Sequence, residues 1–210
     1  MADSPFTLAD PALAARLARV MDPEGKIDRA LDAIAGLAGR DVLVVGPARG
    51  RRPAHLRAMG ASVTTAPLAR LPGLAAGSAD AVIACWTALD RPGPAAERGH
   101  AAVARILRPG GRLLLLTDYG RDDVAGLSSD ANPTEEHDRM RGRDTWFVAR
   151  GFKLHVIHAW WRFESVEAAG EFLGAAFGER GRAVADGMRR PRLAHKLVVY
   201  HRTLDAGEVA

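Results

Sequence analysis

The acidic segment that follows a run of leucines is the first place in this sequence where side chains could perform chemistry. Asp118 and Tyr119 come directly after RLLLLT, residues 112–117, and Asp122 and Asp123 lie in the same loop. A carboxylate at the end of a buried strand is well placed for ligand binding in an α/β sheet. Asp118 could position an acceptor group or remove its proton. The alternative is a solvated turn, because Asp and Gly favour turns without any functional role.

A glycine-bounded turn offers a second candidate site. The segment DVLVVGPARG spans residues 41–50, and its apolar half predicts a short strand buried on both faces. The following PAHLRAMG predicts a helix with proline in its first turn. Backbone N–H groups and the positive end of a helix dipole would face a ligand there, although such a turn also simply connects a strand to a helix. The turn consists of Gly46, Pro47, Ala48, Arg49 and Gly50.

Three further groups of residues are weaker candidates. Trp86, just past ADAVIAC, could stack on a ligand ring or pack at the rim of the sheet. The aromatic cluster at residues 160–163 could line an acceptor pocket or a subunit interface, although core packing is the simpler interpretation. His155 and His158 point to opposite faces of a predicted strand, and Cys85 is the one cysteine. No metal site is therefore expected.

The elements that must position these residues alternate between strand and helix, which predicts a parallel sheet with right-handed crossovers. Segment 67–77 is too short and too rich in Pro and Gly for a helix plus a strand, and residues 178–191 are expected to be a polar connection. Strands are expected at residues 42–45, 62–66, 79–85, 112–117, 152–158 and 193–202. Helices are expected from Pro11, from Pro23 and from near Pro53, at residues 94–107 and 134–150, and from Ser165.

Length and composition indicate a soluble globular protein. A chain of 210 residues with 26% charged residues is ordinary for one domain, and we expect a helical extension over residues 1–38 and one domain over 39–210. No signal-like or membrane-spanning segment is visible, so a cytoplasmic location is expected. The net charge is only +4. The arginine clusters lack interleaved aromatic residues, so nucleic-acid binding is not favoured.

Residues 39–118 resemble the class I S-adenosylmethionine-dependent methyltransferases, specifically methyltransferases of type 11. The resemblance rests on four motifs in order: GRDVLVVGPARG, GASVTT, LPGLAAGSADAVIAC and AAVARILRPGGRLLLLTDYG. It implies a Rossmann-like α/β fold with a mostly parallel seven-stranded sheet, or six strands if one is missing, and an antiparallel last strand. It also implies methyl transfer from S-adenosylmethionine to a small-molecule acceptor at the carboxyl ends of the strands, without a metal. Homodimers would be compatible with such a protein.

The chain departs from the family pattern where the cofactor would bind. Ala48 replaces the middle glycine of the turn, and Pro67 stands where an acidic residue would hold the ribose. A carboxylate offers two strong acceptors and proline offers none, so the cofactor motif is degenerate. Either the cofactor binds in an altered way, with Asp80, Trp86 or Asp90 helping, or the protein is a non-catalytic binding or scaffold protein. The arginines at 49, 51 and 52 would suit an anionic ligand.

Overall fold

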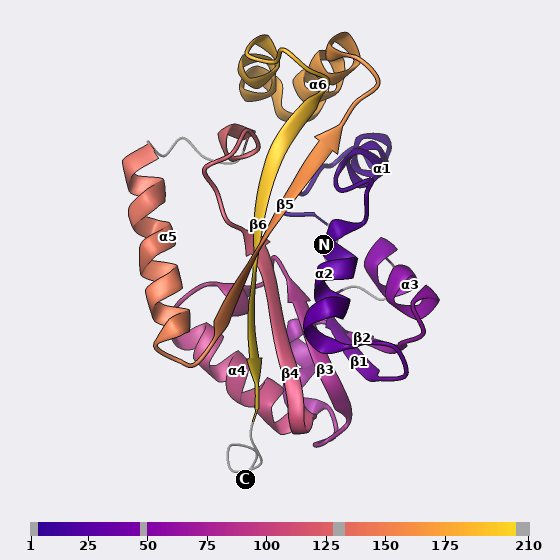
Figure 1. The fold of residues 1–210 in the computed structure, drawn as a ribbon, viewed down its shortest axis with the longest axis vertical. Helices are drawn as coiled ribbons and strands as arrows, with labels where there is room; N and C mark the ends of the chain where they lie inside the picture. The colour runs from indigo at the N-terminus through magenta and orange to yellow at the C-terminus, as the bar shows by residue number, and fades with distance from the viewer. Residues whose placement is uncertain (1–3, 47–49, 128–132, 205–210) are drawn as a thin grey trace.

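The computed structural model describes residues 4–46, 50–127 and 133–204 of the chain, which form a sheet covered by helices (Figure 1). The strands are β1 (Asp41–Val45), β2 (Ser62–Ala66), β3 (Ala79–Cys85), β4 (Leu107–Asp118), β5 (Lys153–Arg162) and β6 (Arg192–Thr203). The helices are α1 (Pro11–Val20), α2 (Lys26–Ala35), α3 (Arg51–Ala58), α4 (Pro94–Ile106), α5 (Pro133–Val148) and α6 (Val166–Asp186).

The six strands form one sheet in the order β2-β1-β3-β4-β6-β5. The first four are parallel to one another, whereas β6 is antiparallel to both β4 and β5. The carboxyl ends of β1, β2, β3 and β4 therefore lie along one edge of the sheet. This arrangement confirms the expected Rossmann-like methyltransferase fold in its six-stranded form, with an antiparallel last strand.

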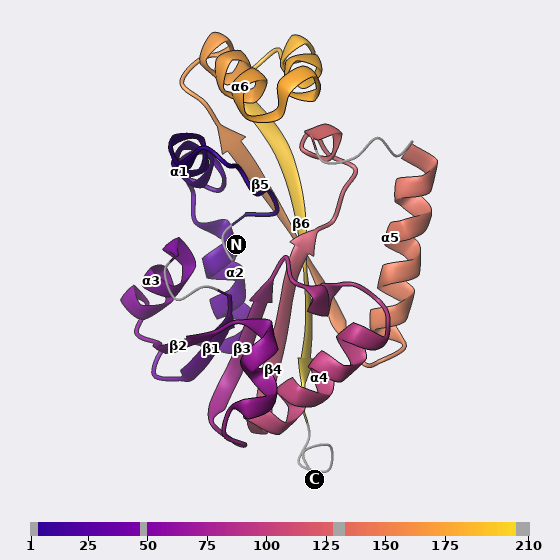
Figure 2. The ribbon, with the colours of Figure 1, turned by 180° about the vertical axis from the view of Figure 1, so that it is seen from behind.

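The two faces of the sheet are built by alternation along each strand. In β4, Leu113 and Leu115 join the apolar cluster beneath α4 and α5, whereas Leu114 and Leu116 join the cluster beneath α2 and α3. All four are almost completely buried. A continuous leucine run is needed here because both faces are covered by helices. Figure 2 shows α4 crossing the face opposite α2.

The expected gap in the fold is present between β2 and β3. Residues Leu68–Gly73 form a short 3-10 helix containing Pro72, and the chain then enters β3 directly. Between β2 and β3 the described chain contains no α-helix and no further strand. The sheet therefore ends at β2, and Pro67, which begins the 3-10 helix, is exposed.

The last two strands are longer than the sequence suggested, and one helix was missed. Strand β5 continues through Trp161, which is fully buried against α1 and α6, so this member of the aromatic cluster serves core packing. Residues 178–186 are helical, so the predicted polar connection over 178–191 is wrong there. Gly178 breaks α6 with a φ of 62°, and Gly181 lies so close to Leu173 that a Cβ atom would be 1.8 Å from its carbonyl oxygen. Two glycines thus allow α6 to fold back on itself at the top of the molecule (Figure 1).

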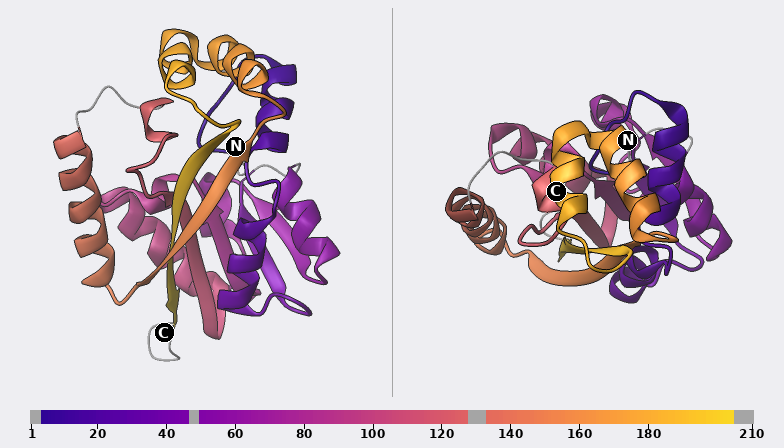
Figure 3. Two further views of the ribbon diagram at one scale, coloured as in Figure 1. Left: turned by 45° about the horizontal axis from the view of Figure 1, so that its top comes forward. Right: turned by 90° about the horizontal axis from the view of Figure 1, so that it is seen from above.

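The N-terminal helices pack on the sheet and on α6. Asp10 caps α1 by accepting hydrogen bonds from the backbone of Ala12 and Leu13, and Asp22 accepts from the backbone of Lys26 and Ile27 at the start of α2. Helix α1 lies beside α6, and α2 contacts β5 and α3 (Figure 3). The separate unit proposed for residues 1–38 stays a prediction.

Candidate functional site

A cavity of about 1060 Å³ lies at the carboxyl ends of β3 and β4. It is large enough for a drug-sized ligand. Its walls come from the ends of these strands, from the loop after β4, from α5 and from residues 5–7. The polar and aromatic side chains that line it include Trp86, Asp90, Thr117, Asp118, Tyr119, Arg139, Arg143, Trp146 and His195. The structure thus brings Trp86, Asp118 and Tyr119 to one cavity, and that they bind a ligand stays a prediction.

Asp118 is held at the cavity by two N–H donors. The Trp86 indole nitrogen lies 3.1 Å and the His195 Nε2 atom 3.0 Å from the same oxygen, Oδ1. The Trp161 indole nitrogen lies 3.2 Å from Nδ1 of His195. Because an indole N–H can only donate, Nδ1 accepts, so Nε2 carries the imidazole proton and donates to Asp118. These bonds fix Oδ1 of Asp118, and no hydrogen bond to its Oδ2 atom is found among the described residues.

Trp86 adopts an unusual backbone conformation at the end of β3. Its φ of 49° lies in the left-handed region, which L side chains rarely adopt. Such a conformation costs on the order of 1–3 kcal/mol and is found most often at functional sites. Here it directs the indole toward Asp118 across the mouth of the neighbouring strand.

Asp90 is the most buried carboxylate of the cavity. Asp90 is only 4% exposed, and its Oδ2 atom has no hydrogen-bond partner among the described residues. Burial raises the pKa of Asp90 to about 6, and the Thr117 side chain, Arg91 and Arg143 oppose this shift only in part. At neutral pH the cavity therefore contains a buried, ionised carboxylate with one free acceptor atom.

Arg143 of α5 faces the same cavity from the other wall. Its Nε atom donates to the Tyr200 hydroxyl at 2.9 Å, and the hydroxyl in turn donates to Asp144. Burial raises the pKa of Tyr200, so the hydroxyl stays protonated. These bonds fix the guanidinium, yet its buried Nη2 atom has no partner among the described residues.

The other acidic residues of the loop after β4 have structural roles. Asp122 accepts from the backbone of Lys196 and Ala125, and Asp123 accepts from the backbone of Ala194 at 2.7 Å. Burial also raises the pKa of Asp122. The turn interpretation of this loop thus holds for its second half, whereas Asp118 faces the cavity. Tyr119 lines the cavity and packs against the apolar core.

The glycine turn lies at the other half of the carboxyl edge. Gly46 follows β1 and its N–H donates to the Ala66 carbonyl at 2.9 Å, and Gly50 precedes α3 in an extended conformation. No side chain caps α3 within the described residues. Pro47, Ala48 and Arg49 lie outside the described residues. Gly46, Gly50 and Pro67 do not line the large cavity.

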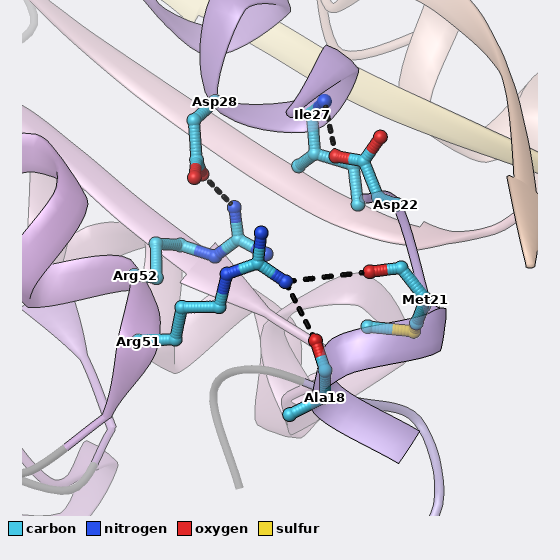
Figure 4. Close-up of a pocket in the computed structure, with 7 residues that line it drawn as sticks. All are labelled: Ala18, Met21, Asp22, Ile27, Asp28, Arg51 and Arg52. Atoms are coloured by element: carbon cyan, nitrogen blue, oxygen red, sulfur yellow. Dashed lines mark hydrogen bonds and ion pairs between the residues drawn. The ribbon is translucent and has the colours of Figure 1, made fainter. Parts of the chain in front are cut away.

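Arg51 and Arg52 are held by the N-terminal helices rather than turned toward a ligand (Figure 4). Arg51 donates to the Ala18 carbonyl at 2.6 Å. Arg52, which is only 5% exposed, forms an ion pair with Asp28. The cavity beside them measures about 20 Å³, the space of about one water molecule. The expectation that these two arginines bind an anionic ligand is therefore wrong, because their guanidinium groups fasten α1 and α2 to α3.

Asp80 requires a further correction. It lies near the start of β3, at the amino edge of the sheet, and therefore away from Trp86 and Asp118. Its carboxylate accepts from the Asp41 backbone at 2.9 Å and pairs with Arg108 at 2.9 Å. Burial opposes these bonds, but together they lower the pKa of Asp80. Asp80 therefore joins strands β1, β3 and β4 and does not belong to the candidate site.

His195 and Arg143 were not predicted as site residues. Each lies far from Asp118 in the sequence, and only the antiparallel pairing of β4 with β6 brings His195 beside the end of β4. The repeated arginines of α5 were visible, but nothing in the sequence distinguishes Arg143 from its neighbours. Among residues 4–46, 50–127 and 133–204, no three metal-ligating side chains gather, and no helix is long and apolar enough to span a membrane.

Solved structures share this fold at low sequence identity. No protein-family model matches the sequence, and no curated protein matches it significantly. A methyltransferase of Geobacter sulfurreducens, determined with S-adenosyl-L-homocysteine, is 14% identical with a TM-score of 0.51, over 94% of this chain and 100% of its own.

Two further structures are named as putative methyltransferases. The one from Anaeromyxobacter dehalogenans is 20% identical with a TM-score of 0.54, over 84% of this chain and 97% of its own. The one from Bacillus halodurans is 14% identical with a TM-score of 0.53, over 85% and 98%. The chain therefore has the Rossmann-like fold of the class I S-adenosylmethionine-dependent methyltransferases.

Proposed function

We propose that this protein transfers a methyl group from S-adenosylmethionine to a small-molecule acceptor bound in the large cavity. The observation that carries this proposal is Asp118, which lines the cavity and whose carboxylate is fixed through one oxygen by Trp86 and His195. A fixed carboxylate at the end of β4 can orient an acceptor group and accept its proton.

The residues at the carboxyl edge fit the cofactor at one end. Within the described residues the first turn of α3 has no side-chain cap, so its backbone N–H groups are suited to the carboxylate of the methionine moiety. Trp86 offers an aromatic face beside the acceptor cavity. When bound, S-adenosylmethionine supplies an electrophilic methyl group on its sulfonium.

The fit is poorer at the ribose. Pro67 follows β2 with no acceptor side chain, and Asp80, which was expected to substitute, lies at the opposite edge of the sheet. Ribose binding must therefore rely on backbone groups or on water. We expect affinity for the cofactor to be weaker than a site with a ribose-binding carboxylate would give, since each lost charge-assisted hydrogen bond is worth about 1.5–3 kcal/mol.

The test is isothermal titration of the full chain with S-adenosylmethionine and S-adenosylhomocysteine, with a thermal shift as a second readout. Micromolar to submillimolar binding of either compound supports the proposal. If millimolar ligand produces neither heat nor a shift in melting temperature, the methyltransferase proposal fails. The non-catalytic binding or scaffold role then becomes the better interpretation.

A further inference from the structure

Two residues that line the large cavity each carry a buried polar atom without a hydrogen-bond partner among the described residues, and the two atoms are of opposite character. Oδ2 of Asp90 is an acceptor and Nη2 of Arg143 is a donor, and neither has a hydrogen bond within the described residues. A buried polar group without a partner costs about 1–3 kcal/mol. Two such groups on one cavity indicate a ligand that supplies what each of them lacks.

The two residues come from different elements, and Arg143 is held by a contact of its own. Asp90 lies in the short helical turn after β3, whereas Arg143 projects from α5 and is fastened by the Tyr200 hydroxyl. The guanidinium is near enough to influence the carboxylate electrostatically, but they form no ion pair. The lining of the cavity therefore includes an anionic residue, Asp90, and a cationic residue, Arg143.

A ligand that complements both residues carries a cationic and an anionic group. An ammonium group donates to an ionised carboxylate, and a guanidinium fork suits a carboxylate. The lining also includes aromatic and aliphatic side chains that would contact an apolar body, among them Phe6, Trp86, Tyr119, Leu127 and Trp146. We propose that the cavity binds an amino acid with an apolar side chain, its ammonium group at Asp90 and its carboxylate at Arg143.

This inference rests on the proposed function in one respect: the bound amino acid would be the methyl acceptor. Binding can nevertheless be measured without the cofactor. A thermal-shift screen of the full chain against each standard amino acid at millimolar concentration is the first step. We expect amino acids with large apolar side chains to raise the melting temperature, and if none does, the proposal fails.

The second step separates the two charges. For an aromatic side chain, L-phenylalanine carries both charges, phenethylamine only the ammonium, and 3-phenylpropionate only the carboxylate. We expect the zwitterion to bind at least about tenfold more tightly than either single-charge compound, a difference of about 1.4 kcal/mol. Equal affinities would mean that the cavity recognises only the ring, which contradicts the proposal.

Substitutions then assign the charges to residues. Asp90→Asn and Arg143→Gln should each weaken amino-acid binding about tenfold or more, with Asp90→Asn also improving phenylpropionate relative to phenethylamine. Arg141→Gln, on the same helix but not in the cavity lining, is the matched control and should change nothing. If Arg143→Gln does not fold, as judged by circular dichroism, Arg143→Lys provides the second variant. Unchanged affinity in the folded variants would overturn the assignment.

Titration of the same variants with S-adenosylhomocysteine distinguishes the two proposals. Unchanged cofactor binding places the zwitterion site outside the cofactor site, as proposed. If the variants instead lose cofactor affinity, Asp90 and Arg143 bind the amino-acid end of the cofactor and the acceptor proposal is overturned. If the wild-type protein binds amino acids but no cofactor, the binding site stands and the methyltransferase proposal fails.

Discussion

The two halves of the carboxyl edge of the sheet use charged residues in opposite ways. At the β1–β2 half, Arg51 and Arg52 are paired with the backbone of α1 and with Asp28, and the space beside them is about the size of one water molecule. At the β3–β4 half, Asp90 and Asp118 line a cavity of about 1060 Å³, and Oδ2 of Asp90 has no hydrogen-bond partner among the described residues. In the first half these two arginines are engaged in contacts with other helices, whereas in the second the charged residues line a large cavity.

The difference shows that charge clusters in a sequence do not identify a site. Three arginines near a glycine turn indicated an anion-binding site, yet two of them attach the N-terminal helices to α3. The carboxylates of the other half are spread along the chain and became a site only when β6 was placed beside β4. We therefore expect substitutions in the β1–β2 half to change stability and substitutions at Asp118 to change activity.

Asp118→Asn should have the largest effect on activity. The amide keeps an acceptor for Trp86 and His195 but cannot accept a proton, so kcat should fall by roughly 10²- to 10⁴-fold, with the melting temperature almost unchanged. The measurement is steady-state methylation with the amino acid that binds best in the thermal-shift screen as acceptor. Asp123→Asn, in the same loop, is the control. Full activity of Asp118→Asn would remove Asp118 from the chemistry.

Asp28→Ala should have the largest effect on stability. It leaves the Arg52 guanidinium buried without its carboxylate, which typically costs about 3–5 kcal/mol. Denaturant unfolding of the variant measures this change in the free energy of unfolding. Asp138→Ala, at an exposed position on α5, should change it by less than about 0.5 kcal/mol. A similar small loss for Asp28→Ala would mean that the contact in Figure 4 does not fasten the helices.

Asp90→Asn should stabilise the protein without ligand while weakening amino-acid binding. The pKa of Asp90 is raised from 3.8 to about 6, so the folded state binds more protons than the unfolded state between these values. The ionised carboxylate therefore costs up to about 3 kcal/mol above pH ~6, and the asparagine removes about 1–3 kcal/mol of that cost. The gain should shrink as the pH falls from about 6 toward 4, because the wild-type carboxyl becomes protonated.

Unfolding curves of both proteins at several pH values measure this gain. Arg91 and Arg143, which act on Asp90, stay charged throughout this range. A destabilised Asp90→Asn variant at pH 7 would indicate that Asp90 has a structural role instead.

His195→Leu should lower the free energy of unfolding by about 1–3 kcal/mol, because it leaves the buried Trp161 N–H without its acceptor. Activity should also fall, since Asp118 loses one of its two donors. His195→Gln, whose amide can both accept and donate, should recover part of each loss. His155→Leu, at an exposed position of β5, is the control and should leave stability and activity nearly unchanged.

Much of the fold was predictable because its signals are local. The leucine run before Asp118, the glycine turn after β1 and the alternation of strands with helices determine a parallel sheet, and Pro67 with Pro72 rules out a complete crossover before β3. The helical end of α6 was missed because Gly178 and its polar neighbours resemble a loop, whereas Gly181 lets the chain return against Leu173. That close approach is a property of two segments and has no signature in either one.

For the site, the sequence determined that Trp86, Asp118 and Tyr119 end two strands of a parallel sheet and would therefore share its carboxyl edge. The tertiary structure decided the partners: His195 reaches Asp118 from β6, Arg143 faces Asp90 from α5, and Arg51 and Arg52 contact the N-terminal helices. It also showed that Asp80 lies at the opposite edge of the sheet, where it forms an ion pair with Arg108. The physical reason is that strand direction follows from local pattern, whereas the pairing of charged side chains depends on which distant segments are packed together.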